Sequence, residues 1–501
     1  MQRTGRPLVA GVALTVAALL AASGGCGSHA NNGEDFGADA ESDAPEDVTM
    51  GFSLGGNASS GGSFSKGMCS PGNGLGCKVN TNCPAGRHTT ITGKVYDPAG
   101  RNPLYNIAVY VPNDPSMLPA ITTGTNTCLP CQPIQDYVAL TQTAPDGSFT
   151  LPDVPSGKNV PLVAQVGKWR RTTLVPTVAD CATTQVPDSG NGQVRLPRNR
   201  HEGDMPQMAL LTGGLDDLGC FMSRLGIDSA EYSPPLGGGR LDIYQGLGNA
   251  AGGGGQATGP GLSSGGKAGD CTTTSCPLWA SKKSFENYDI VLLACEGDTF
   301  DADTRVDGGL NFGGTGANVT RVGKQAMHDW LNEGGKVFAT HFHYTWFANG
   351  PTDFQGVATW LGPSIGNQQI QGSIDTSFAR GMAFKIWLKD VGALGSNGLL
   401  PMTGVATSVL GINTQTTIRW IYDNGNNLTK YLSFATPIGG TGGANPYYCG
   451  KAVFTDLHAG GSPMGDVPGS CKNTALSQQE KALEYLFFDL AACVPEAVPP
   501  K

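Results

Sequence analysis

The chain has 501 residues, which exceeds the length that one hydrophobic core usually covers, so we expect two folded domains. The formal net charge is −9 at pH 7 and no basic stripe is present to neutralise phosphates, which argues against a nucleic-acid partner. Many of the 74 glycines lie in two tracts, residues 51–67 and 237–269, which we interpret as a flexible linker and an inserted loop.

The first 25 residues have the pattern of an export signal. A basic start, MQRTGR, precedes the 15-residue apolar run LVAGVALTVAALLAA, which is shorter than the roughly 20 residues that span a membrane. The small residues SGG then lead to Cys26. This arrangement resembles a bacterial lipoprotein signal peptide, residues 1–25. The resemblance implies that Cys26 is lipidated and anchors the chain in a membrane.

Two residues qualify this resemblance. Ser23 stands where the family usually has a larger apolar residue, so cleavage near Ala22 without lipidation is the alternative. Gly27 is not the aspartate that signals retention at the inner membrane, which implies the outer membrane. The acidic, Gly/Ser-rich residues 26–66 cannot bury enough apolar surface to fold and are expected to form a disordered tether.

Cysteine usage is typical of an exported protein. The chain has 14 cysteines, 13 of them after Cys26. In an oxidising compartment most of these should be paired, and the local candidates are Cys271 with Cys276 and Cys449 with Cys471. Because 13 is odd, at least one thiol should remain.

A Cys-rich lead-in, residues 67–88, precedes the first predicted strands. The CLPC motif at 128–131 has the spacing of a redox or zinc motif, but no helix follows it and the chain has no second CxxC. We therefore interpret it as part of a structural disulfide among the cysteines between residues 69 and 181.

Residues 89–186 read as short alternating strands broken by the turn signals DPAG, PDG and PSG, which predicts an all-β sandwich. PDG at 145–147 predicts a tight hairpin turn. ITGKVYDPAGRNPLYNIAVYV and TAPDGSFTLPDVPSGKNVPLVAQ resemble the carboxypeptidase regulatory-like, transthyretin-like sandwich. That family is generally non-catalytic and is often grouped with carbohydrate-binding folds, so the resemblance implies that loops would hold any ligand.

After a linker at 187–204, strand and helix patterns alternate over 205–495, around the Gly-rich insertion at 237–269. The predicted strands are PQMALLTGG, NYDIVLLACEGD, KVFATHFHY, TIRWIYD, YLSFATPI and KAVFTDLHA. The predicted helices are DDLGCFMSRLGI, VTRVGKQAMHDWLNEGG and SQQEKALEYLFFDLAAC, the last with Ser477 and Glu480 as a capping box. Such alternation predicts an α/β, flavodoxin-like domain with a mostly parallel sheet.

NYDIVLLACEGD, NEGGKVFATHFHYTWF and GKAVFTDLHAG are similar to the class I glutamine-amidotransferase-like superfamily, and within it to the ThuA-like branch. That branch has a strand that follows a double glycine and ends on histidine, and a late strand of the form aromatic-Thr-x-Leu-His. The matching positions are Gly334, Gly335, His341, Phe454, Thr455, Leu457 and His458. An active amidotransferase carries a cysteine at the strand-to-helix elbow, where this chain has ATHFHYT, so glutaminase chemistry is not expected.

Three strand ends should meet at one edge of such a sheet. They carry Cys295, Glu296 and Asp298, then His341 and His343, then Asp456 and His458. Alternate strand residues share a face, and imidazoles with a carboxylate are a common Zn or Fe ligand set. The candidate metal site is therefore His341, His343, His458 and Asp456. The alternative is that one histidine ends the strand and the other packs beside Tyr344 and Trp346.

A second interpretation makes Cys295 a thiolate nucleophile. His341 or His458 would then be its base, with Glu296 or Asp456 as the orienting group. The alternative is a buried, apolar Cys295, or one paired with Cys220. Elsewhere, Asp216 and Asp217 would repel an anion at a helix start, so we expect a helix-capping role for them.

The sequence as a whole predicts an exported lipoprotein, anchored by lipid in the outer membrane on its periplasmic or cell-surface side. Its expected function is non-catalytic binding of polysaccharide or another surface component, with no cofactor. The alternative function is a metal- or thiol-dependent hydrolase, with Zn or Fe, acting on a sugar-derived or amide substrate at the cluster around His341.

Overall fold

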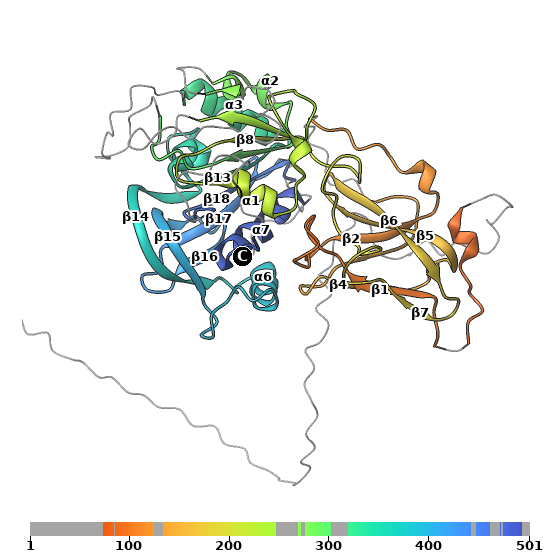
Figure 1. Cartoon of the computed structure of the whole chain (residues 1–501). Coiled ribbons are helices and arrows are strands. Elements are labelled where there is room, and N and C mark those ends of the chain that lie inside the picture. The colour runs from red at the N-terminus through yellow and green to blue at the C-terminus, as the bar shows by residue number, and fades with distance from the viewer. Residues whose placement is uncertain are drawn as a thin grey trace, which may run out of the picture. The chain divides into compact units, whose positions relative to one another are not determined.

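The computed structural model describes residues 74–84, 86–124, 134–246, 269–271, 276–301, 319–441, 447–460, 471 and 474–492 (Figure 1). Several predictions lie outside these residues. They are the signal peptide, the lipidated Cys26, the tether at 26–66, the CLPC motif, the start of the Cys-rich lead-in and most of the Gly-rich insertion. In the described part of the chain no helix is long and apolar enough to cross a bilayer.

The segment predicted as a β-sandwich consists of two small sheets. One has the order β4-β1-β7, and the other the order β3-β2-β5-β6. Their inward-facing residues, which include Ile91, Val109 and Leu162, are fully buried. The strands are β1 (Thr90–Lys94), β2 (Ala108–Pro112), β3 (Tyr137–Gln142), β4 (Ser148–Leu151), β5 (Gly157–Val166), β6 (Trp169–Val178) and β7 (Thr183–Gln185).

The PDG turn forms, but it does not close a hairpin. Gly147 has a φ of 75° and its N–H donates to the carbonyl of Ala144, as in a tight turn. The strands on either side, β3 and β4, belong to different sheets. The hairpin prediction is therefore wrong, because a turn signal does not specify which strands pair.

The second part of the chain forms one 11-stranded sheet of order β11-β10-β8-β12-β13-β18-β17-β16-β14-β15, with β9 beside β10. Its first strands, from β11 to β18, are mutually parallel. The strands are β8 (Met208–Leu211), β9 (Tyr232–Ser233), β10 (Leu241–Gln245), β11 (Gly269–Asp270), β12 (Ile290–Leu293), β13 (Lys336–Thr340), β14 (Ala358–Ile374), β15 (Leu400–Ile412), β16 (Thr417–Asp423), β17 (Thr429–Thr436) and β18 (Gly450–Thr455).

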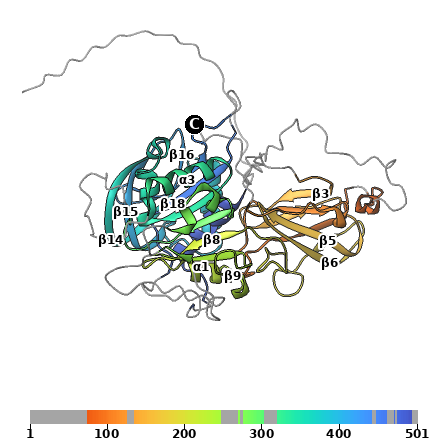
Figure 2. The ribbon, with the colours of Figure 1, turned by 90° about the horizontal axis from the view of Figure 1, so that it is seen from above.

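The remaining pairs, from β18 to β15, are all antiparallel. Figure 2 shows β14 and β15 side by side at one edge of the sheet. The described chain is mostly β, with a mixed sheet and seven α-helices, four of them under eight residues long. The prediction of a mostly parallel, flavodoxin-like α/β domain is therefore wrong. Strands such as β12, β17 and β18 were located correctly, but β10, β14 and β15 were missed, and the antiparallel pairing of the later strands was not predicted.

Alternation along β8 shows how the sheet is covered on both faces. Met208 and Leu210 belong to one hydrophobic cluster, and Ala209 and Leu211 to another. The first cluster contains residues of α1 and α7, and the second contains residues of α2 and α3, on opposite sides of the sheet in Figure 1. The helices are α1 (Leu218–Arg224), α2 (Lys282–Phe285), α3 (Arg321–Asn332), α4 (Thr345–Ala348), α5 (Thr352–Gln355), α6 (Ala379–Asp390) and α7 (Gln478–Ala491).

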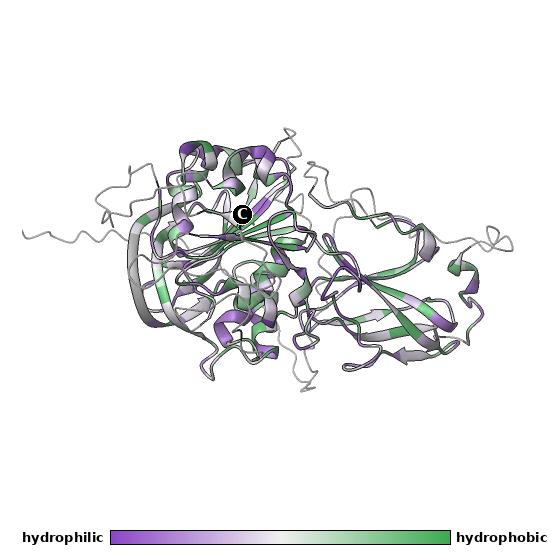
Figure 3. Ribbon diagram, turned by 45° about the horizontal axis from the view of Figure 1, so that its top comes forward, coloured by the Kyte–Doolittle hydropathy of each residue, from purple (hydrophilic) through white to green (hydrophobic). Residues whose placement is uncertain are grey.

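Helix α7 begins as predicted. The hydroxyl of Ser477 accepts from the N–H of Glu480, and the Glu480 carboxylate accepts from the N–H of Ser477, which is a capping box. The helix is buried on several sides, since 11 of its 14 residues are buried. Figure 3 shows apolar, green segments along the strands in the middle of the large sheet. Trp169 of β6 packs edge-on against Phe487 and Phe488 of α7, so the small sheets and the large sheet share one core.

Candidate functional site

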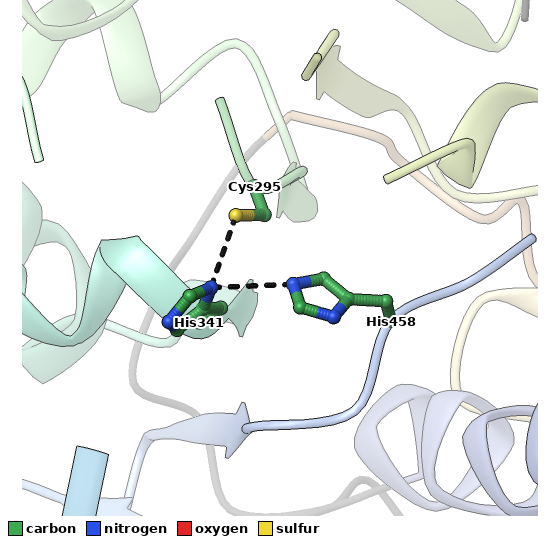
Figure 4. A group of neighbouring side chains, drawn as sticks. All are labelled: Cys295, His341 and His458. Atoms are coloured by element: carbon green, nitrogen blue, oxygen red, sulfur yellow. Dashed lines mark hydrogen bonds between the residues drawn. The ribbon is translucent and has the colours of Figure 1, made fainter. Parts of the chain in front are cut away.

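Three side chains converge at the carboxyl ends of three adjacent parallel strands. Cys295 lies two residues after β12, His341 directly after β13 and His458 three residues after β18. The Nδ1 atom of His341 lies 3.4 Å from the Sγ atom of Cys295 and 3.2 Å from the Nε2 atom of His458 (Figure 4). The pairing registers of β12, β13 and β18 bring these ends together, as the strand-end argument predicted.

His341 reaches this position through an unusual backbone conformation. The strand ends at Thr340, and His341 begins the 3₁₀ helix η5 (His341–Tyr344) with a φ of 37°. A positive φ is rare for a residue with a Cβ, and such strain concentrates at functional sites. The sharp turn directs the imidazole back across the strand end towards Cys295 and His458.

The tautomer of His458 is set by its other ring nitrogen. Nδ1 lies 2.6 Å from the carbonyl oxygen of Gly404, so Nδ1 carries a proton and donates it to this acceptor. In the neutral ring the lone pair is then on Nε2, which faces His341. Gly404 can present its carbonyl in this way because its φ of 66° lies in the left-handed region.

Cys295 is a free and fully buried thiol. Burial, and then the negative charge of Asp216, raise the pKa of Cys295 well above its ordinary value, although the N–H groups of Phe342 and Gly297 act in the opposite direction. A thiol with a raised pKa stays protonated at neutral pH and is a poor nucleophile. A metal cation in contact with the sulfur would reverse this, because a coordinating thiol loses its proton.

The ligand atoms have the spacing of a metal site. Bond lengths of about 2.0–2.1 Å for Zn–N and 2.3 Å for Zn–S in a tetrahedron place two nitrogen ligands roughly 3.3 Å apart, and sulfur and nitrogen roughly 3.6 Å apart. The observed separations are 3.2 Å and 3.4 Å. All three ligand atoms lie within 4.8 Å of one another, and no other Cys, His, Asp or Glu of the described chain joins this group. The residues therefore fit a three-ligand site.

His343 does not take part in the site, contrary to the prediction. Its Nε2 atom lies 2.9 Å from the carbonyl oxygen of Ala294, and its Nδ1 atom accepts from the indole N–H of Trp346. Burial lowers the pKa of His343 to about 4, so the ring is neutral. The prediction assumed that the strand continues through His343, whereas the 3₁₀ helix turns His341 and His343 in different directions. His343 makes the contact with Trp346 that the alternative interpretation describes.

Asp456, which was also predicted as a metal ligand, interacts with residues outside the candidate site. Its Oδ2 atom accepts from the N–H of Ser408, and the charge of Lys430 acts on the carboxylate. Burial nevertheless raises the pKa of Asp456 above its ordinary value. Among the described residues, the group of potential metal ligands contains Cys295 in place of the predicted Asp456 and His343.

Glu296 and Asp298 follow Cys295 along the chain. Glu296 is fully buried, and its Oε2 atom lies 4.0 Å from the Nε2 atom of His343. Its charge also acts on the Cys295 thiol. Asp298 accepts from the N–H of Thr299, and burial raises its pKa. Glu296 is thus a buried acid beside the site, whereas Asp298 hydrogen-bonds to Thr299 in its own loop.

No protein-family profile and no curated protein matches the chain. Among solved structures, it resembles the cytoplasmic protein STM3548 from Salmonella typhimurium with a TM-score of 0.23 and 10% identity, over 42% of this chain and 73% of that chain. It resembles the cytoplasmic protein STM1381 from Salmonella typhimurium LT2 with a TM-score of 0.28 and 9% identity, over 57% of this chain and 96% of that chain. Scores at this level do not establish a shared fold, so the site has to be interpreted from its own geometry.

The cysteine pairings differ in part from the prediction. The disulfide Cys271–Cys276 is confirmed, and Cys83–Cys181 lies within the predicted group between 69 and 181. The pairing of Cys449 with Cys471 is wrong, because Cys471 forms a disulfide with Cys220 over a sequence separation of 251. The same disulfide removes Cys220 as a partner of Cys295, and Cys295 is the free thiol among the described cysteines.

Two residues that support the site were not recognised in the sequence as parts of it. Asp216 was expected only to cap a helix, but it is Asp217 that caps α1, by accepting from the N–H of Cys220. The Asp216 carboxylate instead contacts the segments that carry the ligands. The sequence carries no signal for Gly404, because the carbonyl that accepts from His458 belongs to β15, a strand that the sequence pattern does not reveal.

Proposed function

We propose that this protein is an exported, zinc-dependent hydrolase, with Cys295, His341 and His458 as the metal ligands. The observation that carries this proposal is the convergence of three ligand atoms within 4.8 Å of one another, with both separations from His341 close to tetrahedral values. The Nδ1–H of His458 donates to the carbonyl of Gly404, so that its Nε2 lone pair faces the group. A backbone carbonyl that accepts from the second nitrogen of a ligating histidine is a regular feature of zinc sites.

The state of the other cysteines supports both the metal and the export. Eight described cysteines are disulfide-bonded, which is typical of an oxidising compartment, whereas Cys295 is free. A metal ligand is one reason for such a protein to keep a buried thiol beside two imidazoles. The disulfide-bonded residues are Cys77, Cys83, Cys181, Cys220, Cys271, Cys276, Cys449 and Cys471.

Among the residues that the structure describes, the number of candidate ligands favours catalysis over a structural role. Structural zinc sites are closed by four protein ligands, whereas catalytic sites have three and keep one position for water or substrate. Bound zinc lowers the pKa of such a water towards neutrality. His458 is the most exposed of the three residues, so a substrate would approach from its side. Glu296, buried next to Cys295, is the acid that could hold the proton of that water.

Metal analysis of the purified full-length protein tests this proposal. We expect about one zinc per chain, lost in His341→Ala, His458→Ala and Cys295→Ser. His343→Ala is the discriminating variant, since it should lose stability but keep the metal. His88→Ala, an exposed histidine at another site, is the control.

Hydrolysis of small chromogenic esters and amides by the zinc-loaded protein, and its loss with a chelator, would then establish the reaction class. Absence of metal from the wild-type protein after incubation with zinc would refute the proposal. The non-catalytic binding function expected from the sequence would then be favoured over the hydrolase. Retention of metal by His341→Ala would refute the assignment of the ligands.

A further inference from the structure

A single buried carboxylate connects the three segments that carry the candidate ligands. Asp216 lies between β8 and α1 and is 5% exposed. Its Oδ2 atom accepts from the N–H of Cys295 at 3.1 Å and from the hydroxyl of Thr340. Its Oδ1 atom accepts from the N–H of Ala459 at 2.7 Å. The three donors are Cys295 itself, the residue before His341 and the residue after His458.

The backbone around Asp216 holds it close to the same strand ends. The N–H of Leu215 donates to the carbonyl of Cys295, and the N–H of Asp217 donates to the carbonyl of Ala459, each at 3.0 Å. At Gly213 a Cβ atom would lie 2.2 Å from the carbonyl oxygen of Cys295, so only glycine permits this close approach. The loop from 213 to 217 therefore fixes Asp216 against two of the three ligand segments.

We propose that Asp216 is the positioning residue of the ligand group, holding Cys295, His341 and His458 in register for one metal ion. This inference rests on the proposed zinc site. The chemistry requires a carboxylate, because all its partners are donors directed at both of its oxygens. An asparagine would offer one oxygen and place an NH₂ group against a remaining donor. Either Ala459 or the Cys295–Thr340 pair would then be displaced.

The test compares Asp216→Asn with Asp217→Asn. The two substitutions are identical in chemistry and adjacent in sequence, but the Asp217 side chain only caps α1, a role that asparagine also performs well. Cobalt titration, followed by the visible spectrum of the bound ion, reports both affinity and ligand geometry. We expect Asp216→Asn to bind cobalt 10–100-fold more weakly with an altered spectrum, which is the usual effect of removing a residue that supports metal ligands. Asp217→Asn should behave as the wild type.

A second pair of variants covers the case in which Asp216→Asn fails to fold. Thr340→Val removes the hydroxyl that donates to Asp216, and Thr340→Ser retains it. We expect weaker cobalt binding for Thr340→Val and near-normal binding for Thr340→Ser. Equal affinities in both pairs of variants would overturn the inference.

A readout without metal separates this inference from the proposed function. In the metal-free protein, the rate at which iodoacetamide alkylates Cys295, measured on its peptide by mass spectrometry, reports how firmly the strand end is held. We expect a faster rate in Asp216→Asn than in Asp217→Asn. If the wild-type protein takes up no cobalt or zinc, the metal proposal fails while the alkylation rates still decide the positioning role. Equal rates would refute that role.

Discussion

Glu484 of α7 and Asp97 of the small-sheet region form a pair of buried carboxyl groups whose protonation should govern stability near neutral pH. Their exposed fractions are 0% and 1%. Two adjacent carboxylates cannot both ionise in such a place. Burial raises the pKa of Asp97 from 3.8 to about 6, although the N–H groups of Arg101 and Asn102 and the contact with Glu484 lower it. Burial and the charge of Asp97 raise the pKa of Glu484 well above 4.5.

The direction of the pH effect follows from these shifts. Because the pKa of Asp97 is higher in the folded protein than in the unfolded chain, the folded state binds more protons between about pH 4 and pH 6. The stability that this group contributes is fully present below the unfolded value and is lost as the pH rises through about 6. At roughly 1.36 kcal/mol per pKa unit, a rise of about two units corresponds to about 3 kcal/mol.

Glu484→Gln is the perturbation that tests this reasoning. Glutamine is nearly isosteric, can still accept from the side-chain amide of Asn102, which lies 2.7 Å away, and needs no bound proton. Burial raises the pKa of Glu484 well above 4.5, so the folded protein holds a proton on this group at pH values where the unfolded chain does not. Glutamine avoids this cost, so the variant should be more stable than the wild type at pH 7. Its advantage should shrink towards pH 4.5.

Urea unfolding followed by tryptophan fluorescence at pH 4.5 and pH 7 measures the difference between the variant and the wild type. Taking this difference cancels the contribution of titrating groups that lie away from the Asp97–Glu484 pair. Glu333→Gln, at a carboxylate that is 47% exposed, is the matched control and should show no such dependence. An advantage of Glu484→Gln that is equal at both pH values, or absent at pH 7, would refute the reasoning.

Three further predictions concern stability. A disulfide that closes a longer loop restricts the unfolded chain more and so stabilises the fold more. Replacing Cys220 and Cys471, which are 251 residues apart, by alanine should therefore lower the free energy of unfolding by about 5 kcal/mol, and replacing Cys271 and Cys276, which are 5 residues apart, should lower it by about 2 kcal/mol. Equal losses in guanidinium unfolding would contradict this dependence on loop length. Ser477→Ala breaks the capping box and should lower the free energy of unfolding by about 1 kcal/mol. A melting temperature that is unchanged in this variant but lowered in the Ser477→Ala, Glu480→Gln double variant would disprove the role of Ser477. Lys324 lies 2.7 Å from Asp301, and the two side chains are only 1% and 4% exposed. Lys324→Met leaves the buried Asp301 carboxylate without this cation and should lower the free energy of unfolding by about 3–5 kcal/mol. The double variant with Asp301→Leu should recover part of this loss in the same assay.

The sequence predicted the strands better than their pairing. Buried, apolar strands such as β12 and β18 have an unmistakable pattern, and their ends were located correctly. The segment of β14, ATWLGPSIGNQQIQGSI, contains glycine, proline and asparagine, residue types that are depleted in strands, and so was not recognised. One signal of antiparallel pairing was present. DNG at 423–425 lies between the apolar runs of β16 and β17, and such a turn favours a hairpin.

The sequence predicted where the candidate site lies, but only some of the residues that form it. The strand-end argument identified Cys295, His341 and His458, because it depends only on parallel pairing. The predicted metal site included His343 because the alternation of side chains along a strand was assumed to continue beyond Thr340, where the strand ends. Asp216 could not be found, since its partners are 79, 124 and 243 residues away and no local pattern indicates such contacts.

The edge strand β15 returns to the site from the far end of the sheet. It supplies the carbonyl of Gly404 to His458 and the N–H of Ser408 to Asp456, and the N–H of Ala406 donates to the carbonyl of Asp456. Local unfolding of β15 would release the His458 ring to rotate and to exchange its tautomer. Metal affinity would then scale with the fraction of molecules in which β15 is docked, and amide exchange at Ala406 and Ser408 would measure that opening equilibrium directly.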